Sequence, residues 1–376
     1  MTAIGGRITK VGRGRPAVAA EDLGEVALLP GLVNAHTHLE LSEFAGRVPP
    51  AEAMVPWIRS MVGVRGRGTD ASSATAIAAA RDALRGLVDD GTALVGDVSN
   101  SLLSAPLLAE ADLAGVVFHE ILGFSRPDPN ADVQAAWARV DETVAAPARG
   151  AVAAHAPYSV SPALFGAVAA AKRATPLTVH LGESRAEIEF LQTGGGPFRE
   201  LLESFGVWTD SWQPPACDPV EYLDRVGYLK PGAIVVHGTH LDAGALARLR
   251  ARNGFVVTCP RSNAWVGEGD PPVHAFYASG VPVAIGTDSL TSAPSLRLFD
   301  EMAAVRRVAP GIAPDRILDS ATRVGAEALG WGADFGTIAA GKRAVFAAVA
   351  LSAFEGDVEE YLVSGVPADR VRTVRA

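Results

Sequence analysis

The chain has 376 residues, 48% of them hydrophobic, and a formal net charge of −9. This length allows a sizeable core and suits one large α/β domain with a small accessory domain. Acidic residues are spread along the chain without any cluster of Lys or Arg, which argues against a nucleic-acid partner. The apolar runs are short and interrupted, so the sequence predicts no membrane span.

The N-terminal stretch MTAIGGRITKVGRGRP lacks the apolar core of a signal peptide, so we expect a cytoplasmic protein. Residues 1–28 are rich in Gly, Val and Arg and contain short strand-like runs. The tail from about residue 336 reads as short strands and turns. We expect segments 1–28 and 336–376 to meet in a small β-domain.

Between the two ends, short β-branched or apolar runs alternate with longer stretches rich in Ala, Leu and Arg. This alternation predicts parallel βα units, and eight of them fit a (β/α)₈ barrel over residues 29–335. A doubly wound sheet is the alternative. The eight runs are residues 31–38, 92–99, 115–123, 150–158, 176–184, 232–240, 254–260 and 281–289.

Residues 190–230 form a longer connection than a βα unit needs. Their Gly, Pro and Trp content indicates a lid-like insertion that covers the substrate. The two cysteines, Cys217 and Cys259, lie far apart in sequence, which excludes a disulfide framework and a cysteine-rich zinc site.

The histidines follow the predicted strands. Seven of the eight lie at or near the C-terminal end of a run, where barrel enzymes carry their active sites. Such convergence is difficult to explain by core packing and indicates chemistry. The seven are His36, His38, His119, His155, His180, His237 and His240.

His36 and His38 alternate on one predicted strand, so both side chains face the same side and can bind a metal. A pair of surface histidines is the alternative for this pair alone. Glu183 and Asp288 add carboxylates on two other strand ends. Three histidines and an aspartate suit a zinc-like ion, which makes hydroxide available near neutral pH. With a glutamate to carry protons, these parts are those of a hydrolase.

Six strand-end motifs together resemble the amidohydrolase superfamily, in particular its cytosine deaminase and chlorohydrolase-like branch. The resemblance runs along nearly the whole chain and implies a (β/α)₈ barrel with a small β-sandwich built from both chain ends. The tail motif GTIAAGKRA is normally followed by Asp, whereas this chain has Val345. The six motifs are PGLVNAHTH, HAPYS, HLGES, VVHGTHLD, CPRSN and GTDS.

The resemblance also implies roles for individual residues. Glu183 is the proton shuttle, His237 orients the water or polarises the attacked C=N group, and Asp288 also takes a proton from the water. His155 and His240 line the substrate pocket, with support of other side chains as the alternative for each. The implied metal ligands are His36, His38, His180 and Asp288.

One divalent metal is expected, with zinc preferred over iron. Binuclear members of the superfamily bridge two metals with a carboxylated lysine at the end of the fourth strand. This chain has His155 there, and Lys172 lies in the following helix. Family members are often dimers or larger assemblies, so a homodimer is compatible with the resemblance, although no stretch of the sequence marks an interface.

The expected substrate is a small amino-substituted heterocycle. Trp57 could stack on a planar base, with packing between lid and barrel as the alternative. In relatives that act on S-adenosylhomocysteine or methylthioadenosine, a glutamate that follows the second metal histidine holds the ribose. Arg65 occupies that place here and suits a substrate with a carboxylate, such as aminodeoxyfutalosine.

The sequence therefore predicts a hydrolytic deaminase that releases ammonia by attack of a metal-activated water. A chlorohydrolase or amidase that uses the same metal site is the alternative within the family. A non-catalytic barrel protein is the alternative from another class, and the complete set of metal and acid residues argues against it.

Overall fold

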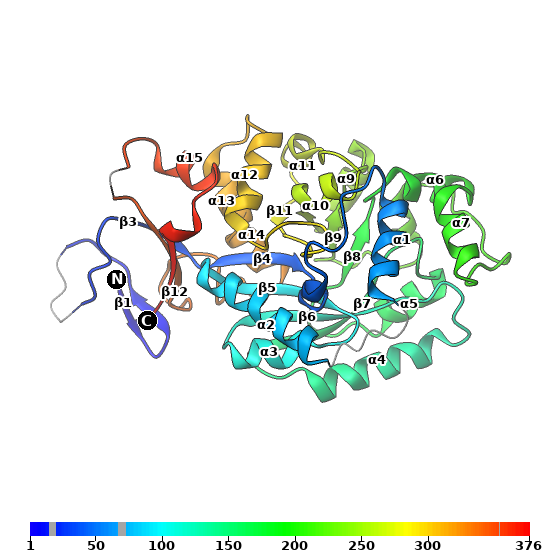
Figure 1. Cartoon of the computed structure of the whole chain (residues 1–376), viewed down its shortest axis with the longest axis horizontal. Coiled ribbons are helices and arrows are strands. Elements are labelled where there is room, and N and C mark those ends of the chain that lie inside the picture. Colours follow the sequence, from blue (N-terminus) through cyan, green and yellow to red (C-terminus); the bar gives the residue numbers. More distant parts are fainter. Residues whose placement is uncertain (15–19, 67–72, 353) are drawn as a thin grey trace.

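The computed structural model describes residues 1–14, 20–66, 73–352 and 354–376 (Figure 1). Two four-stranded parallel sheets lie at its centre. Neighbouring strands pair in the order β4-β5-β6-β7 in one sheet and β8-β9-β10-β11 in the other. Each of the eight predicted runs overlaps one of these strands, although β6 and β7 begin one and two residues before their runs. The strands are β4 (Leu32–Thr37), β5 (Thr92–Ser99), β6 (Ala114–Ile121), β7 (Ala148–Ala154), β8 (Thr178–Leu181), β9 (Ile234–His237), β10 (Phe255–Thr258) and β11 (Val283–Ile285).

The two sheets contact each other at two seams. At one seam, the backbone N–H of His180 on β8 donates to the carbonyl of His155, just after β7, at 2.9 Å. At the other, Thr37 on β4 forms a parallel bridge with Asp288, which follows β11. Gly286 permits this second approach, because a Cβ there would lie 2.7 Å from the Cβ of His36.

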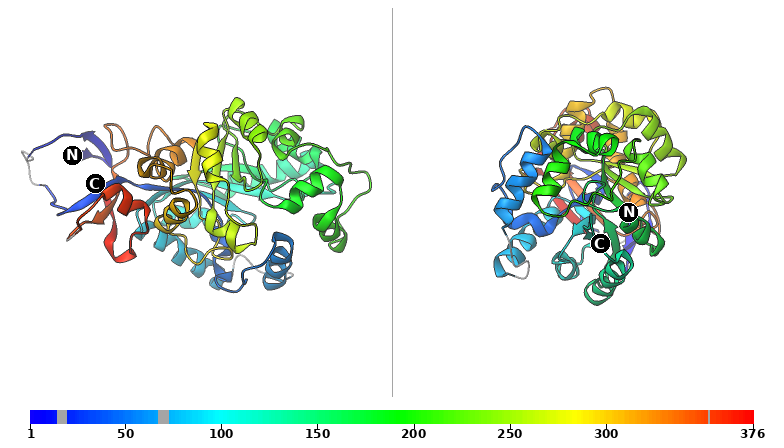
Figure 2. Two further views of the ribbon diagram at one scale, coloured as in Figure 1. Left: turned by 90° about the horizontal axis from the view of Figure 1, so that it is seen from above. Right: turned by 90° about the vertical axis from the view of Figure 1, so that its right-hand side faces the viewer.

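Helices alternate with the strands and cover the outside of the sheets (Figures 1 and 2). Helix α2 illustrates the local rules: Ser73 caps its first turn by accepting from the backbone N–H of Ala76, and its apolar face is buried. With α2 (Ala74–Asp89), the helices of this region are η1 (Leu39–Phe44), α1 (Met54–Arg65), α3 (Ser104–Glu110), α4 (Pro129–Thr143), α5 (Pro162–Ala170), α9 (Ala243–Ala251), α10 (Pro260–Trp265), α11 (Val273–Ser279), α12 (Leu298–Val308), α13 (Pro314–Ser320) and α14 (Arg323–Ala328).

The long connection at 190–230 contains helices rather than an open loop. Helix α6 (Arg185–Thr193) ends at the left-handed Gly194, and α7 (Gly196–Ser204) and α8 (Pro219–Arg225) follow. The ring of Trp212 stacks on that of Phe190 with centroids 4.4 Å apart. The aromatic residues of this insertion therefore belong to a small apolar cluster, which also includes Phe124 and Tyr158 from outside the insertion.

The two chain ends meet at one end of the molecule (Figure 1). Strand β12 (Val345–Ala350) pairs antiparallel with β3 (Val26–Pro30) on one side and with β13 (Val371–Arg375) on the other. A hairpin of β1 (Thr2–Ile4) and β2 (Arg7–Lys10) joins them through a 2.8 Å bond from the N–H of Ile8 to the carbonyl of Lys342. Helix α15 (Val358–Val363) and the short η2 (Ala368–Arg370) complete this region.

None of the described helices is long and apolar enough to cross a membrane.

Candidate active site

Four histidines lie together where the parallel strands end. His36 is on β4, His38 follows it directly, His180 is on β8 and His237 ends β9. The ring centroids of His36 and His38 are 4.8 Å apart, and those of His36 and His180 are 4.9 Å apart. The structure therefore brings together three histidines predicted as metal ligands, although they come from strands far apart in sequence.

The donor atoms of this cluster have the spacing of a metal site. The Nε2 atoms of His38 and His180 lie 3.3 Å apart, and Asp288 Oδ1 lies 3.6 Å from His38 Nε2. In a tetrahedral zinc site with bonds of about 2.0–2.1 Å, neighbouring donor atoms lie about 3.3 Å apart. Both ring nitrogens of the buried His36 lack a hydrogen-bond partner. A buried polar atom without a partner is costly, and a cation coordinated by Nε2 would remove that cost.

Burial keeps two of these imidazoles neutral, as metal ligation requires. It lowers the pKa of His36 well below its ordinary value, and the neighbouring histidines lower that pKa further. Burial also lowers the pKa of His237 to about 4, against the opposing charge of Asp288. These two neutral imidazoles can present lone pairs to the centre of the cluster. Burial opposes protonation of His180, but its bond to Glu120 and the charge of that carboxylate raise the pKa of His180 to about 9.

Two hydroxyl groups orient the carboxylate of Asp288. Ser262 and Ser292 donate to its Oδ2 at 2.5 and 3.0 Å, which leaves Oδ1 directed at His36 and His38. Asp288 has a φ of 57° and His237 a φ of 71°, both in the left-handed region that non-glycine residues rarely adopt. Strain of this kind concentrates at functional sites, where surrounding contacts hold it in place.

Glu183 and His237 face each other beside the cluster, with Oε1 of Glu183 3.5 Å from Nε2 of His237. Asn263 lies 2.9 Å from Nδ1 of His237, and its Oδ1 can accept the ring proton there, which leaves Nε2 as the acceptor nitrogen. Burial raises the pKa of Glu183 well above its ordinary value. A carboxyl group of this kind can hold a proton near neutral pH and release it to a neighbouring base.

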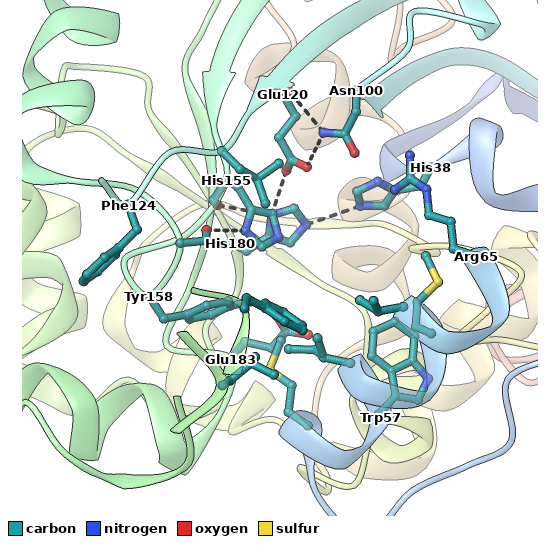
Figure 3. Close-up of a pocket in the computed structure, with 18 of the residues that line it drawn as sticks. His38, Trp57, Arg65, Asn100, Glu120, Phe124, His155, Tyr158, His180 and Glu183 are labelled. Carbon is teal, nitrogen blue, oxygen red and sulfur yellow. Dashed lines mark hydrogen bonds and ion pairs between the residues drawn. The ribbon is translucent and has the colours of Figure 1, made fainter. Parts of the chain in front are cut away.

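A second group of polar side chains adjoins the histidines (Figure 3). Glu120, on β6, lies 3.3 Å from Nδ1 of His180 and accepts a hydrogen bond from the side-chain amide of Asn100 at 3.1 Å. His155 lies beside them, and its ring centroid is 4.9 Å from that of His180. Burial opposes ionisation of Glu120, but the nearby His155 and His180 lower its pKa overall. Glu120 is therefore a buried anion against a predicted metal ligand.

A cavity of about 500 Å³ opens above these groups. Trp57, Arg65 and His155, which are expected substrate-binding residues, line it together with His38, His180, Glu183, His237 and Asp288. Its outer walls are largely apolar and come from α1, from the segment after β6 and from the 190–230 insertion. These wall residues include Met54, Ile58, Met61, Val62, Leu122, Phe124, Leu201, Leu202, Phe205 and Val207.

His240, predicted in the substrate pocket, is not among the residues that line this cavity. Its Nε2 instead lies 3.0 Å from Oε2 of Glu268. This contact agrees with the alternative expectation, in which His240 supports another side chain and does not touch the substrate. Among the tryptophans, Trp57 faces the cavity, while the indole N–H of Trp265 donates to the carbonyl of Val48 at 3.2 Å.

The family profile described as the amidohydrolase family matches residues 27–369. The chain belongs to the amidohydrolase family. This amidohydrolase is 32% identical over 334 residues to an aminodeoxyfutalosine deaminase from Deinococcus radiodurans, with 83% of this chain and 75% of that protein covered. The family assignment thus agrees with the motifs and with the clustered histidines.

Two solved structures resemble this amidohydrolase closely. One is an aminofutalosine deaminase from Helicobacter pylori in complex with methylthio-coformycin, with a TM-score of 0.78 and 26% identity, covering 90% of this chain and 82% of that one. The other is an adenosine deaminase from Xanthomonas campestris with bound zinc, with a TM-score of 0.75 and 25% identity, covering 92% and 78%.

Sequence reasoning did not assign roles to several residues that hold this amidohydrolase's site together. Ser262 contacts Asp288 and Asn263 contacts His237, and both lie in the CPRSN motif. Two adjacent polar residues after a buried strand were the sequence feature that could have indicated a role in the site. Glu120 follows His119 on β6, and of these two it is Glu120 that lines the cavity. His119 instead lies with its Nδ1 3.2 Å from the carbonyl of Ser99.

Proposed function

We propose that this amidohydrolase is a hydrolytic deaminase that releases ammonia from the adenine-type base of a nucleoside. The observation that carries the proposal is the position of Glu183 and His237 against the donor cluster, at the inner end of a cavity with an apolar outer wall. Water replaces the amino group of a C=N carbon, so that the products are a ring carbonyl and ammonia.

His36, His38, His180 and Asp288 are the proposed ligands of one divalent cation. Their nitrogen and carboxylate donors suit zinc, and zinc is bound in the similar deaminase from Xanthomonas campestris. A zinc ion at this position would lower the pKa of a water towards neutrality and polarise the attacked group. The proposed single-ion site agrees with His155, rather than a lysine, at the end of the fourth barrel strand.

Glu183 is the proposed proton carrier. Its carboxylate takes a proton from the attacking water and delivers it to the ring nitrogen beside the reacting carbon. A second proton transfer to the amino group then allows ammonia to leave and the carbonyl to form. Neutral His237, held by Asn263, orients the water or polarises the attacked group, and Asp288 is the proposed second acceptor of the water's proton.

The cavity supports a substrate larger than a free base. About 500 Å³ lies within the usual range of about 300–1,000 Å³ for small-molecule sites. Trp57 is the proposed stacking partner and His155 a proposed hydrogen-bonding partner of the substrate. Arg65 on α1 is the proposed partner of a substrate carboxylate, because guanidinium pairs with carboxylate in a planar two-bond arrangement. An aminodeoxyfutalosine-like nucleoside, which combines an adenine base with an aromatic acid, meets these requirements.

We also propose that the two parallel sheets close into a (β/α)₈ barrel over residues 29–335. The seams at His155–His180 and Thr37–Asp288 support this closure. Segments 1–28 and 336–376 are the proposed small β-sandwich, supported by the pairing of β3 with β12 and by the buried side chains of Ile8 and Phe346.

The test is ammonia release by zinc-loaded protein with adenosine, methylthioadenosine, S-adenosylhomocysteine, aminodeoxyfutalosine, guanine, cytosine, a pterin and a chlorotriazine. Glu183→Gln should abolish turnover while retaining zinc. Glu189→Gln, an exposed acid on the adjacent α6, should behave as wild type. Ammonia from a nucleoside supports the proposal; chloride release alone, or silence from metal-replete protein across the panel, overturns it.

A further inference from the structure

The carboxylate of Glu268 joins three parts of the active-site rim. Its Oε1 accepts the backbone N–H of Met54 at 3.1 Å, and its Oε2 accepts the backbone N–H of Arg185 at 3.2 Å. His240 Nε2 lies 3.0 Å from Oε2 and can donate to it. The Glu268 side chain itself is only 7% exposed, so its carboxylate is largely shielded from bulk water.

Two of these contacts fall on the first residues of helices. Met54 begins α1 and Arg185 begins α6. The first backbone N–H groups of a helix lack partners within the helix, and a negative charge there is favourable. Helix α1 has no capping side chain of its own at Ala53. Glu268 therefore provides from another segment the cap that the sequence around α1 lacks.

Helix α1 depends on this end for its position. Along the helix only Met54 and Val55 are buried, and its later turns are partly or fully exposed. Six of its residues nevertheless line the cavity: Met54, Trp57, Ile58, Met61, Val62 and Arg65. Beyond the first turn, the exposed Arg59 donates to the hydroxyl of Ser204 on α7 at 3.2 Å. A shift of the first turn would tilt the helix and move this wall relative to the catalytic groups.

The segment that leads into α1 also packs closely on the loop that carries Glu268. The N–H of Ala51 donates to the carbonyl of Trp265 at 3.0 Å. A Cβ at Gly267 would lie 2.4 Å from the backbone nitrogen of Ala53, so only glycine fits at this crossing. The close backbone approach brings Glu268 within reach of the start of α1.

We propose that Glu268 and His240 form a positioning pair that sets the α1 wall of the substrate pocket relative to Glu183. The α6 contact matters because Arg185 lies two residues after Glu183, so one carboxylate relates the wall to the proton carrier. His240 holds that carboxylate from the loop that follows β9. The inference rests on the proposed function for the identity of the substrate. The hydrogen bonds of Glu268 are independent of that function.

The pair should affect binding of the outer part of the substrate more than the chemical step. Small displacements of substrate-positioning groups cost large factors in rate or affinity. In Glu268→Ala, KM for a nucleoside with a bulky 5′ substituent should rise about tenfold, while kcat stays within about twofold. For unsubstituted adenosine, which reaches less of α1, KM should change less than about twofold. Zinc content should equal that of wild type.

Conservative variants separate positioning from general loss of structure. Glu268→Gln keeps one acceptor oxygen and should raise KM less than Glu268→Ala. His240→Gln keeps an N–H donor and should be milder than His240→Leu. Glu52→Gln, an exposed acid just before α1, is the matched control and should leave KM unchanged. Equal KM changes for the extended and the unsubstituted substrate would overturn the proposal.

Hydrogen exchange provides a second readout that needs no substrate. The amides of residues 54–65 should exchange faster in Glu268→Ala and His240→Leu than in wild type, while those of β8 and β9 remain protected. Unchanged exchange in α1 would also overturn the positioning role. If wild type turns over no panel member, the proposed function fails, and the exchange experiment still decides the role of Glu268. If Glu268→Ala does not fold, Glu268→Gln and the His240 variants carry both measurements.

Discussion

The backbone N–H of Glu183 donates a 3.1 Å hydrogen bond to the carboxylate of Glu187 on the helix that follows. The other oxygen of Glu187 accepts the N–H of Gly182 at 2.9 Å. Glu187 is fully buried, and burial raises its pKa to about 7. One side chain thus fixes the turn between β8 and α6 that presents Glu183 to His237.

Replacing Glu187 should impair the chemical step without removing the metal. Glu187→Gln keeps one acceptor oxygen and loses one backbone hydrogen bond, so kcat should fall about tenfold, as expected for a hydrogen bond worth about 1.4 kcal/mol. Steady-state kinetics and metal analysis measure this. Glu189→Gln on the same helix is the control. A normal kcat in Glu187→Gln would show that the turn holds its shape without this carboxylate.

Glu120 should tune the affinity for metal through His180. Its carboxylate lies 3.3 Å from His180 Nδ1, the arrangement in which an acid orients a histidine ligand. Glu120→Gln should weaken zinc binding by about 10- to 100-fold, measured by competition with a chromogenic chelator. Glu110→Gln, an exposed acid paired with Arg81, provides the comparison. Unchanged zinc affinity together with a raised KM would assign Glu120 to the substrate instead.

Removal of the metal should abolish turnover reversibly. Dialysis against a chelator should leave a folded protein, since the parallel sheets are stabilised by an extensive apolar core, and zinc should restore activity. Asp288→Asn should not recover with zinc at concentrations that saturate wild type, because a neutral amide is a weaker ligand. Circular dichroism of the metal-free protein checks the fold, and activity that survives complete chelation would contradict the metal-dependent reaction.

Arg65 should discriminate substrates by charge. Arg65→Gln should lower kcat/KM about 10- to 100-fold for a nucleoside with a carboxylate and little for its neutral methyl ester. The comparison of acid and ester in wild type and variant isolates the contribution of charge. Arg59→Gln, which lies on the same helix but outside the cavity lining, is the control. An equal loss for acid and ester would place the carboxylate elsewhere in the site.

Asp97 should make stability depend on pH. Burial raises the pKa of this carboxyl from 3.8 to about 7, against the bonds that it accepts from Ser104 and from the N–H of Leu39. Because the folded protein then binds a proton that the unfolded chain has released, the free energy of unfolding falls as pH rises from about 4 to about 7.

Asp97→Asn removes this titration and keeps one acceptor oxygen for the N–H of Leu39, while its NH2 group faces the hydroxyl of Ser104, which can also accept. Its free energy of unfolding relative to wild type should increase by roughly 2 kcal/mol between pH 5 and pH 8, measured by urea denaturation at equal zinc. A difference that does not change with pH would mean that Asp97 is ionised over this range in the folded state.

The strands were predictable because each is a short, largely apolar and buried run bounded by turn residues, as in 92–99 and 232–240. The clustering of His36, His38, His180 and Asp288 was predictable because these residues sit at strand ends, and parallel strand ends converge. The helical structure within 190–230 was not foreseen in detail, since Pro, Gly and Trp interrupt its pattern and its helices are stabilised by packing of aromatic rings such as Phe190 and Trp212.

The sequence alone thus determined the order of βα units and the chemical nature of the site, because strand patterning and residue type are local properties. It could not place His240, which was predicted to line the pocket but contacts Glu268 instead. Nor could it pair Glu120 with His180 or Glu268 with Met54. Those pairs join residues on different strands and loops, and their distances depend on how the backbone crosses at a few close contacts. Only the tertiary structure fixes those crossings, because each is the joint result of packing many segments at once.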